Sequence, residues 1–453
     1  MEKMRDTIAA IATARGEGGI AIVRVSGDLA AFILENVFYP AVARDGFESH
    51  RLMYGRAVDA KGEILDEVMA VLMRAPRTYT REDVVEIHCH GGGVSARSVL
   101  ARILELGARM AQPGEFTRRA FLNGRIDLSR AEAEMQLIGA NSQAAARASL
   151  RQLEGGVSGF VRQVSDQLTG VMALIEASTD FPDEVEEEAA AAQIICDLQN
   201  IISEIMAHSD RRGARLLREG ASIVLAGRPN VGKSSLMNAL LNQERAIVTD
   251  IPGTTRDVLT ERIIIGGVAA ELSDTAGRRL TEDPIEKMGV DRARRAADSA
   301  DVVLIVLDAA APLDEEDKAL IQAADERAIV CLNKQDLPAI ITSEQITALT
   351  PAKLCMISAE SGQGIPELIS EIARRIAITD ESDGQLVTQR HLELARNAAS
   401  NLQSAISALQ SGMPLDTVAI DLREALAHLG EITGQNATEE VIDRVFSTFC
   451  VGK

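Results

Sequence analysis

The sequence has 453 residues, of which 46% are hydrophobic and 25% are charged, and its formal net charge is −20 at pH 7. This length predicts about three domains, and this balance of residue types excludes disordered, collagenous and disulfide-scaffold proteins. A strongly acidic chain is also a poor candidate for indiscriminate nucleic-acid binding.

No segment has the pattern of a secretion signal or a membrane span. The apolar run at residues 8–14 is too weak for a signal sequence, and no other stretch approaches the roughly 20 apolar residues of a membrane span. The five cysteines lie far apart without a Cys-x-x-Cys pair, which argues against a zinc site or a disulfide scaffold. We therefore expect a folded cytoplasmic protein.

The first part of the chain has the pattern of a mixed α/β domain. Runs rich in β-branched residues, bounded by Gly, Asp or Pro, occupy 19–26, 68–73 and 83–88, and residues 95–106 have helical apolar spacing. We assign residues 1–120 to this domain.

The remaining sequence predicts an α/β domain inserted into a helical one. Residues 129–218 are rich in Ala, Leu, Glu, Gln and Arg, and the same composition returns from about residue 386. This composition indicates long helices. Between them, short apolar strands alternate with helical patterns, as in a parallel, doubly wound sheet. The predicted boundaries are 121–217 and 377–453 for the two helical parts and 218–376 for the insert.

A phosphate-binding motif follows the first strand of the insert. Gly227-Arg-Pro-Asn-Val-Gly-Lys-Ser-Ser235 fits the pattern G-x-x-x-x-G-K-[ST] and opens a helical pattern. The glycines allow backbone N–H groups to face phosphates at a helix start, Lys233 reaches the β- and γ-phosphates, and the Ser234 hydroxyl ligates Mg²⁺. The predicted nucleotide contacts here are Asn230, Val231, Gly232, Lys233, Ser234 and Ser235.

Three further motifs follow in the order of a guanine-nucleotide site, which resembles that of translation-factor-related GTPases. Asp274-Thr275-Ala276-Gly277 follows a strand and offers a carboxylate beside Mg²⁺. Asn333-Lys334-Gln-Asp336 ends another strand, and its aspartate can accept two hydrogen bonds that guanine supplies and adenine does not. Backbone N–H groups of Ser358 and Ala359 complete the predicted base pocket.

The residues expected to drive hydrolysis differ from those of small signalling GTPases. Arg278 stands where those proteins carry a water-orienting glutamine. Asn230 offers a side-chain oxygen to a monovalent cation, which would neutralise transition-state charge as an arginine finger does. A threonine-containing loop that can reach Mg²⁺ and the γ-phosphate supplies Thr249, Asp250, Ile251, Pro252, Gly253, Thr254 and Thr255.

Motifs along the whole chain resemble the tRNA-modification GTPase family MnmE, also called TrmE. Besides the GTPase motifs, they are Gly18–Gly27, Tyr79–Asp83, His90–Gly92, Gly114–Asp127, Asp180–Glu184, Gly430–Gly434 and the terminal Phe449-Cys-Val-Gly-Lys453. The resemblance implies a homodimer joined through N-terminal domains that bind 5-formyl- or 5,10-methylene-tetrahydrofolate. It also implies a potassium-dependent GTPase that works with the flavoprotein MnmG, in a heterotetrameric complex, to install an aminomethyl or carboxymethylaminomethyl group at C5 of the wobble uridine of certain tRNAs.

The same resemblance assigns roles to particular residues. The folate contacts would be Arg24, Glu82, Arg125 and Lys453. The K⁺ ligands would be Asn230, Thr249, Ile251 and Thr254, and the Mg²⁺ ligands Ser234 and Thr255. Glu286 matches the family's water-orienting glutamate, and Cys450 is expected to serve the one-carbon chemistry as a nucleophile or a proton carrier.

Two other classes of protein stay open. One is a ribosome-assembly GTPase, which would need a basic RNA-binding module that the acidic part after residue 125 does not offer. The other is a folate-binding regulator with a GTPase timer and no chemistry of its own. His88 and His90 share a strand face, but without further ligands in the pattern a metal role is disfavoured.

Overall fold

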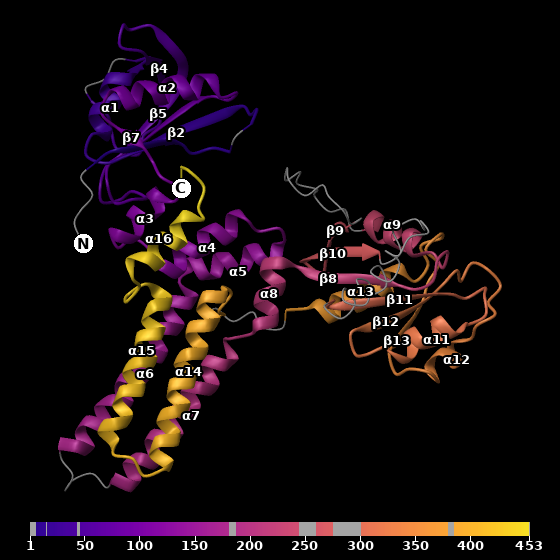
Figure 1. Ribbon diagram of the computed structural model, residues 1–453. Helices are drawn as coiled ribbons and strands as arrows, with labels where there is room; N and C mark the ends of the chain where they lie inside the picture. The colour runs from indigo at the N-terminus through magenta and orange to yellow at the C-terminus, as the bar shows by residue number, and fades with distance from the viewer. Residues whose placement is uncertain are drawn as a thin grey trace, which may run out of the picture. The chain divides into compact units, whose positions relative to one another are not determined.

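The computed structural model describes residues 6–14, 16–42, 46–180, 187–243, 260–274, 300–378 and 385–452. The chain divides into two compact units (Figure 1). The first comprises residues 1–135, 152–202 and 394–453, and the second comprises residues 136–151 and 203–393. The domain boundaries at residues 120, 217 and 376 stay a prediction.

A seven-stranded sheet lies in the N-terminal part of the first unit (Figure 1). Its strands are in the order β3-β4-β5-β6-β2-β1-β7. Neighbouring strands are antiparallel, except that β7 runs parallel to β1. The strands are β1 (Ile8–Ile11), β2 (Ile20–Ser26), β3 (Phe38–Pro40), β4 (Met53–Val58), β5 (Ile64–Met73), β6 (Val84–His90) and β7 (Arg109–Met110).

Alternating burial along these strands gives the sheet one core face. Val23 and Val25 in β2 are fully buried, whereas Arg24 between them points to the opposite face. The helices α1 (Ala30–Val37) and α2 (Val94–Glu105) pack their apolar residues on the core face. The mixed α/β prediction for this region is therefore confirmed.

Helices follow, several of them long, as the composition predicts. They are α3 (Glu115–Leu122), α4 (Leu128–Ile138), α5 (Gln143–Glu154), α6 (Gly156–Asp180), α7 (Glu187–Ala207), α8 (Arg211–Glu219), α14 (Gln389–Gln410), α15 (Leu415–Thr433) and α16 (Glu439–Ser447). Buried residues recur at helical spacing, as with Ile194, Leu198, Ile201 and Ile205 of α7. Helix α15 packs along α6 in the first unit (Figure 1). Among the described helices, none is both long and apolar enough to cross a membrane.

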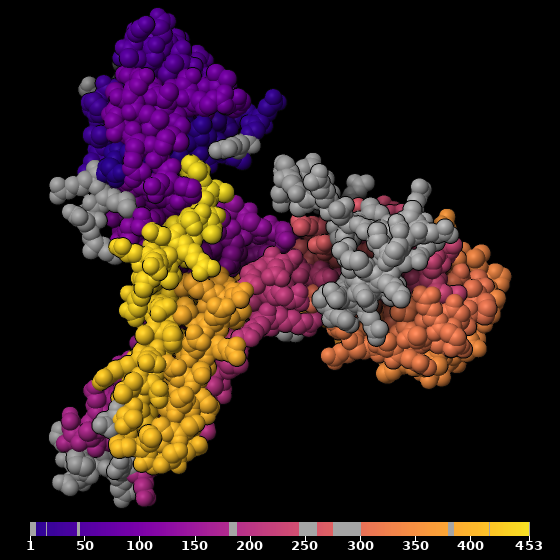
Figure 2. Space-filling view, in the orientation of Figure 1, coloured from indigo at the N-terminus to yellow at the C-terminus, as the bar shows by residue number. Residues whose placement is uncertain are grey.

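The C-terminal helix α16 packs against α3, in the N-terminal part of the first unit. The ring of Phe446 lies 6.1 Å from that of Phe121 in α3 and 5.2 Å from that of Phe449. Gly114, at φ +68°, permits this approach, because a Cβ there would lie 2.5 Å from the carbonyl oxygen of Phe446. Residues 449–452 consequently lie against the N-terminal part, as the yellow segment in Figure 2 shows.

The second unit contains a six-stranded sheet in the order β13-β12-β11-β8-β10-β9, parallel except for β9. Its strands are β8 (Ala221–Ala226), β9 (Thr260–Ile265), β10 (Val268–Asp274), β11 (Val302–Asp308), β12 (Ala328–Asn333) and β13 (Lys353–Met356). Its helices include α9 (Lys233–Gln243), α11 (Glu315–Gln322), α12 (Ser343–Thr347) and α13 (Ile365–Ile376).

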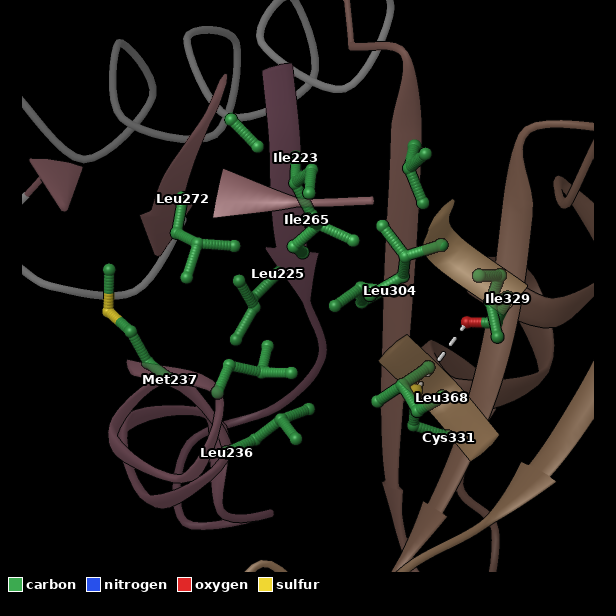
Figure 3. Packing of buried hydrophobic residues seen from close by; sticks show 14 of the residues in the cluster. Ile223, Leu225, Leu236, Met237, Ile265, Leu272, Leu304, Ile329, Cys331 and Leu368 are labelled. Atoms are coloured by element: carbon green, nitrogen blue, oxygen red, sulfur yellow. Dashed lines mark hydrogen bonds between the residues drawn. The ribbon is translucent and has the colours of Figure 1, made fainter. Parts of the chain in front are cut away.

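Helices cover both faces of this sheet. On one side, Ile223, Leu225 and Leu304 pack with Leu236 of α9 and Leu368 of α13 (Figure 3). A separate cluster on the other side brings strand residues of β11 and β12 together with α11 and α12. The doubly wound prediction is confirmed, and the carboxyl ends of the strands form the edge where such folds bind ligands.

Candidate functional site

The phosphate loop links the end of β8 to the start of α9. Gly227 and Gly232 adopt positive φ angles of +142° and +99°, which favour glycine. Space also requires glycine, because a Cβ at Gly227 would lie 2.4 Å from the carbonyl oxygen of Val306 and one at Gly232 would lie 2.2 Å from Nδ2 of Asn333. Asn230 is exposed at φ +66°. The loop therefore has the backbone form that the motif predicts.

Lys233 lies inside this loop, with a side chain that is almost fully buried. Its Nζ donates to the carbonyl oxygens of Gly227 and Arg228, each at 2.7 Å. Burial lowers the pKa of Lys233, and the nearby carboxylates of Asp274 and Glu316 oppose that shift. The ammonium group is thus held by the loop that is predicted to cradle phosphates.

The base motif is tied to the phosphate loop through Asn333. Its Nδ2 donates to the carbonyl oxygen of Val231 at 2.9 Å, and its Oδ1 accepts from the backbone N–H of Ala359 at 3.0 Å. Lys334, at φ +67°, forms a 2.6 Å ion pair with Asp308 at the end of β11. Asn333 therefore joins the phosphate loop to the loop that carries Ser358 and Ala359.

Asp336 carries the predicted recognition of the base. Its Oδ1 accepts a 2.5 Å hydrogen bond from the buried Ser358 hydroxyl, and this bond lowers the pKa of Asp336 below its ordinary value. Because Asp336 is exposed and stays ionised at neutral pH, its carboxylate has acceptor capacity left for two donors of a guanine ring.

Part of the predicted catalytic apparatus lies outside the described residues. This applies to residues 249–255, to Thr275–Gly277, to Arg278 and to Glu286. Within the described chain, Ser234 and Ser235 are exposed in the first turn of α9, and Asp274 ends β10. The hydroxyl of Ser234 and the carboxylate of Asp274 are hard oxygen donors, which suit Mg²⁺.

A second cluster surrounds Tyr79 in the first unit. The guanidinium groups of Arg24 and Arg125 lie 5.9 and 5.7 Å from the centre of its ring, and Arg24 lies 5.7 Å from that of Phe116. Arg24 also donates to Glu86 at 2.9 Å and to the carbonyl oxygen of Gly452 at 3.2 Å. Two of the predicted folate contacts thus share one aromatic residue.

Glu82, the third predicted folate contact, belongs to a buried polar network. It accepts from Ser26 at 2.7 Å and from Nη1 of Arg119 at 3.1 Å. The Arg119 side chain is only 1% exposed and also pairs with Asp6 and Glu115. This network orients the Glu82 carboxylate.

Sequence reasoning missed Arg119 and Tyr79 as parts of this cluster. The Tyr79 hydroxyl contacts Thr117 and Glu134, and burial together with the Glu134 carboxylate raises its pKa above the ordinary value. Both residues stand inside motifs that resemble the family, within Tyr79–Asp83 and Gly114–Asp127. That placement is the signal that could have found them.

Cys450 lies beside the same part of the first unit. Its side chain is exposed, and its carbonyl oxygen accepts from the backbone N–H of Gly114 at 3.3 Å. Cys89, by contrast, is buried, and burial raises its pKa to about 12, so it is an unreactive thiol at neutral pH. Lys453 lies outside the described residues.

The histidines on either side of Cys89 have different acidic neighbours. His88 lies 3.5 Å from Glu86, whereas Nδ1 of His90 lies 2.7 Å from Asp66, which raises the pKa of His90. Within the ranges that the structure describes, no group of three metal-ligating side chains comes together.

The doubly wound sheet, phosphate loop and base motif define a P-loop GTPase. A family model described as the MnmE helical domain matches residues 128–450, and one described as the GTP-binding protein TrmE N-terminus matches residues 7–125. The chain belongs to the MnmE family of tRNA modification GTPases, in which GTP hydrolysis takes place in tRNA modification and Mg²⁺ accompanies the nucleotide.

Full-length relatives support this membership. The tRNA modification GTPase MnmE of Symbiobacterium thermophilum is 46% identical over 460 residues, covering 99% of each chain. The protein of that name from Moorella thermoacetica is 44% identical over 465 residues, again covering 99% of each chain. That from Lactiplantibacillus plantarum is 43% identical over 459 residues, covering 99% of this chain and 98% of the relative.

Proposed function

We propose that this chain acts with the flavoprotein MnmG to add an aminomethyl or carboxymethylaminomethyl group at C5 of the wobble uridine of certain tRNAs. The one-carbon unit comes from 5-formyl- or 5,10-methylene-tetrahydrofolate. The observation that carries this proposal is the hydrogen bond from Arg24 to Gly452, because it brings the Cys450 segment beside cations and aromatic rings. Similarity to tRNA modification GTPases over 99% of the chain supports it.

The direct test is the wobble nucleoside itself. A strain without this protein is expected to lose the modified uridine from its tRNA, and a plasmid copy is expected to restore it. Mass spectrometry of digested tRNA measures both. Unchanged modification together with defective ribosome particles would instead favour a GTPase switch in ribosome assembly.

The chemistry of the Tyr79 cluster fits a folate. Arg24 and Arg125 are cations that complement the carboxylates of such a ligand, and the aromatic rings offer faces to its flat ring system. Glu82, held by Ser26 and Arg119, retains acceptor capacity for the N–H groups of a pterin. The bound folate would supply the one-carbon unit, with Lys453 as a further predicted contact.

We also propose that a second copy of the chain covers the outer face of the N-terminal sheet, giving the homodimer that binds MnmG. Tyr54, Met69, His88 and Ile22 follow one another in register across β4, β5, β6 and β2 on that face. Tyr54 is 57% exposed and Met69 is 38% exposed, and Ile20 on the same face is 58% exposed. Exposed apolar side chains gathered on one sheet face are typical of an interface.

GTP hydrolysis is expected to be much faster in KCl than in equimolar NaCl. The proposed K⁺ ligands are Asn230, Thr249, Ile251 and Thr254, of which Asn230 is exposed in the phosphate loop. A cage sized for K⁺ holds the smaller Na⁺ poorly, so transition-state charge would stay uncompensated. Phosphate release at matched ionic strength measures the difference, and equal rates would remove K⁺ from the mechanism.

Glu286 is proposed to orient the attacking water. In the phosphate-release assay, the turnover of Glu286→Ala should fall by roughly 10²- to 10⁴-fold, as for loss of a general base. Its affinity for GTP should stay normal. Normal turnover would assign the water to another residue.

A further inference from the structure

The segment from Asp308 to Asp317, between β11 and α11, contacts two parts of the nucleotide site. At its beginning, Asp308 pairs with Lys334 of the base motif at 2.6 Å. At its end, Asp314 and Asp317 pair with Arg228, the second residue of the phosphate loop. None of these three aspartates belongs to a nucleotide-binding motif, yet together they join the base loop to the phosphate loop.

Asp317 holds Arg228 in a two-pronged arrangement. Nε of Arg228 donates to Oδ1 of Asp317 at 2.9 Å, and Nη2 lies 2.6 Å from Oδ2. Nη1 donates to Asp314 at 2.7 Å. The side chain of Asp317 is 1% exposed, and that of Arg228 is 24% exposed. Paired contacts of this kind fix the direction of a guanidinium group as well as its distance.

The carboxylate of Asp317 is itself rigidly held at the start of α11. Asp314 caps the helix by accepting from the backbone N–H of Asp317 at 2.9 Å, and Asp317 accepts from the backbone N–H of Asp314 at 3.3 Å. This reciprocal capping box anchors both acids. Ile321 of the same helix is fully buried against the sheet. Arg228 is therefore bound to a carboxylate whose position is fixed by α11.

The main chain of Arg228 passes this constraint on to Lys233. Nζ of Lys233 donates to the carbonyl oxygen of Arg228 at 2.7 Å, so the orientation of that peptide sets where the ammonium group lies. We propose that Asp317 is a positioning residue of the nucleotide site, which holds the phosphate loop and Lys233 through Arg228. Asp317 does not itself touch the nucleotide in this scheme.

The sign of the expected effect separates positioning from simple electrostatics. A carboxylate near the phosphate loop repels the phosphates, so removing its charge alone should tighten nucleotide binding. Loss of positioning should weaken it, because Lys233 and the loop N–H groups would no longer be held in place before binding. A purely structural role would reduce the amount of folded enzyme and leave the KM unchanged.

Asp317→Asn in the full chain is expected to raise the KM for GTP and the Kd for GDP by about tenfold while kcat changes by less than about twofold, the pattern of lost uniform binding. Glu315→Gln is the matched control, because it removes the same charge from the same helical turn. The Glu315 side chain is 91% exposed and pairs only with Lys318 among the described ion pairs. This control should leave all three constants unchanged.

A double-mutant comparison tests the route through Arg228. Arg228→Lys keeps the charge but loses the two-pronged contact, so it should raise the KM in the same way. Adding Asp317→Asn to Arg228→Lys should then have little further effect. An unchanged KM in folded Asp317→Asn, or additive effects in the double variant, would overturn the proposal. If Asp317→Asn fails to fold, as circular dichroism would show, Arg228→Lys alone decides: an unchanged KM overturns the proposal.

Discussion

Asp336→Asn is expected to lower the affinity for GTP by about 10²-fold or more, since a site built around hydrogen bonds rejects a ligand that leaves them unmade. The side chain is exposed at the base loop, and its ionised carboxylate can accept from two N–H donors of guanine. An asparagine presents an NH₂ donor in place of one acceptor. That donor suits the second carbonyl of xanthine, so binding of xanthosine triphosphate should rise.

The structure gives a reason to expect that this variant folds. The Ser358 hydroxyl donates to Oδ1 of Asp336, and the amide oxygen of an asparagine can accept the same bond. Glu360→Gln is the control, because Glu360 is exposed two residues after Ser358 and loses the same charge. Calorimetric titration with both triphosphates measures the change. Weaker GTP binding without any gain for xanthosine triphosphate would mean that Asp336 supports the loop and does not read the base.

Cys450→Ser is expected to abolish the modified wobble uridine while GTP hydrolysis stays normal. The two hydrogen bonds that hold Cys450 and Gly452 use main-chain atoms: the carbonyl oxygen of Cys450 accepts from Gly114, and that of Gly452 accepts from Arg24. The exposed thiol can therefore be exchanged for a hydroxyl of similar size without disturbing the packing. Serine is a far poorer acid and nucleophile, so the proposed one-carbon chemistry should fail.

The phosphate loop belongs to the second unit, whereas Cys450 belongs to the first. Normal potassium-stimulated hydrolysis by the purified variant would show that the GTPase is intact. Cys196→Ser is the control, since Cys196 is also exposed but lies on α7. A deletion strain carrying each variant, followed by mass spectrometry of digested tRNA, gives the second readout. Full modification with Cys450→Ser would leave the chemistry to the folate and the partner flavoprotein.

The phosphate loop and the base motif were predictable because their signals are local. The positive φ angles at Gly227 and Gly232 favour glycine, and Asn333 ends an apolar strand. Continuous apolar runs likewise located β8, β11 and β12, because the strands of a parallel sheet are buried on both faces.

The polar networks were not predictable, since their members are far apart in the sequence. Arg119 meets Asp6 across 113 residues and Glu82 across 37, and no spacing rule links them. Arg228 meets Asp317 across 89 residues, and on a helix Asp317 looks like any acid of a first turn. Resemblance named Glu82 as a ligand, but only the structure reveals what orients its carboxylate.

The hydrogen bond between Arg24 and Gly452 has a consequence for how the protein is made. The two residues are 428 positions apart, so a ribosome working at about 5–20 residues per second adds Gly452 roughly 20–90 s after Arg24. Throughout that interval the newly made N-terminal sheet lacks the neighbour that its arginine binds. The contacts of Arg24 are therefore completed only late in synthesis, and nascent chains that end before Gly452 lack this hydrogen bond.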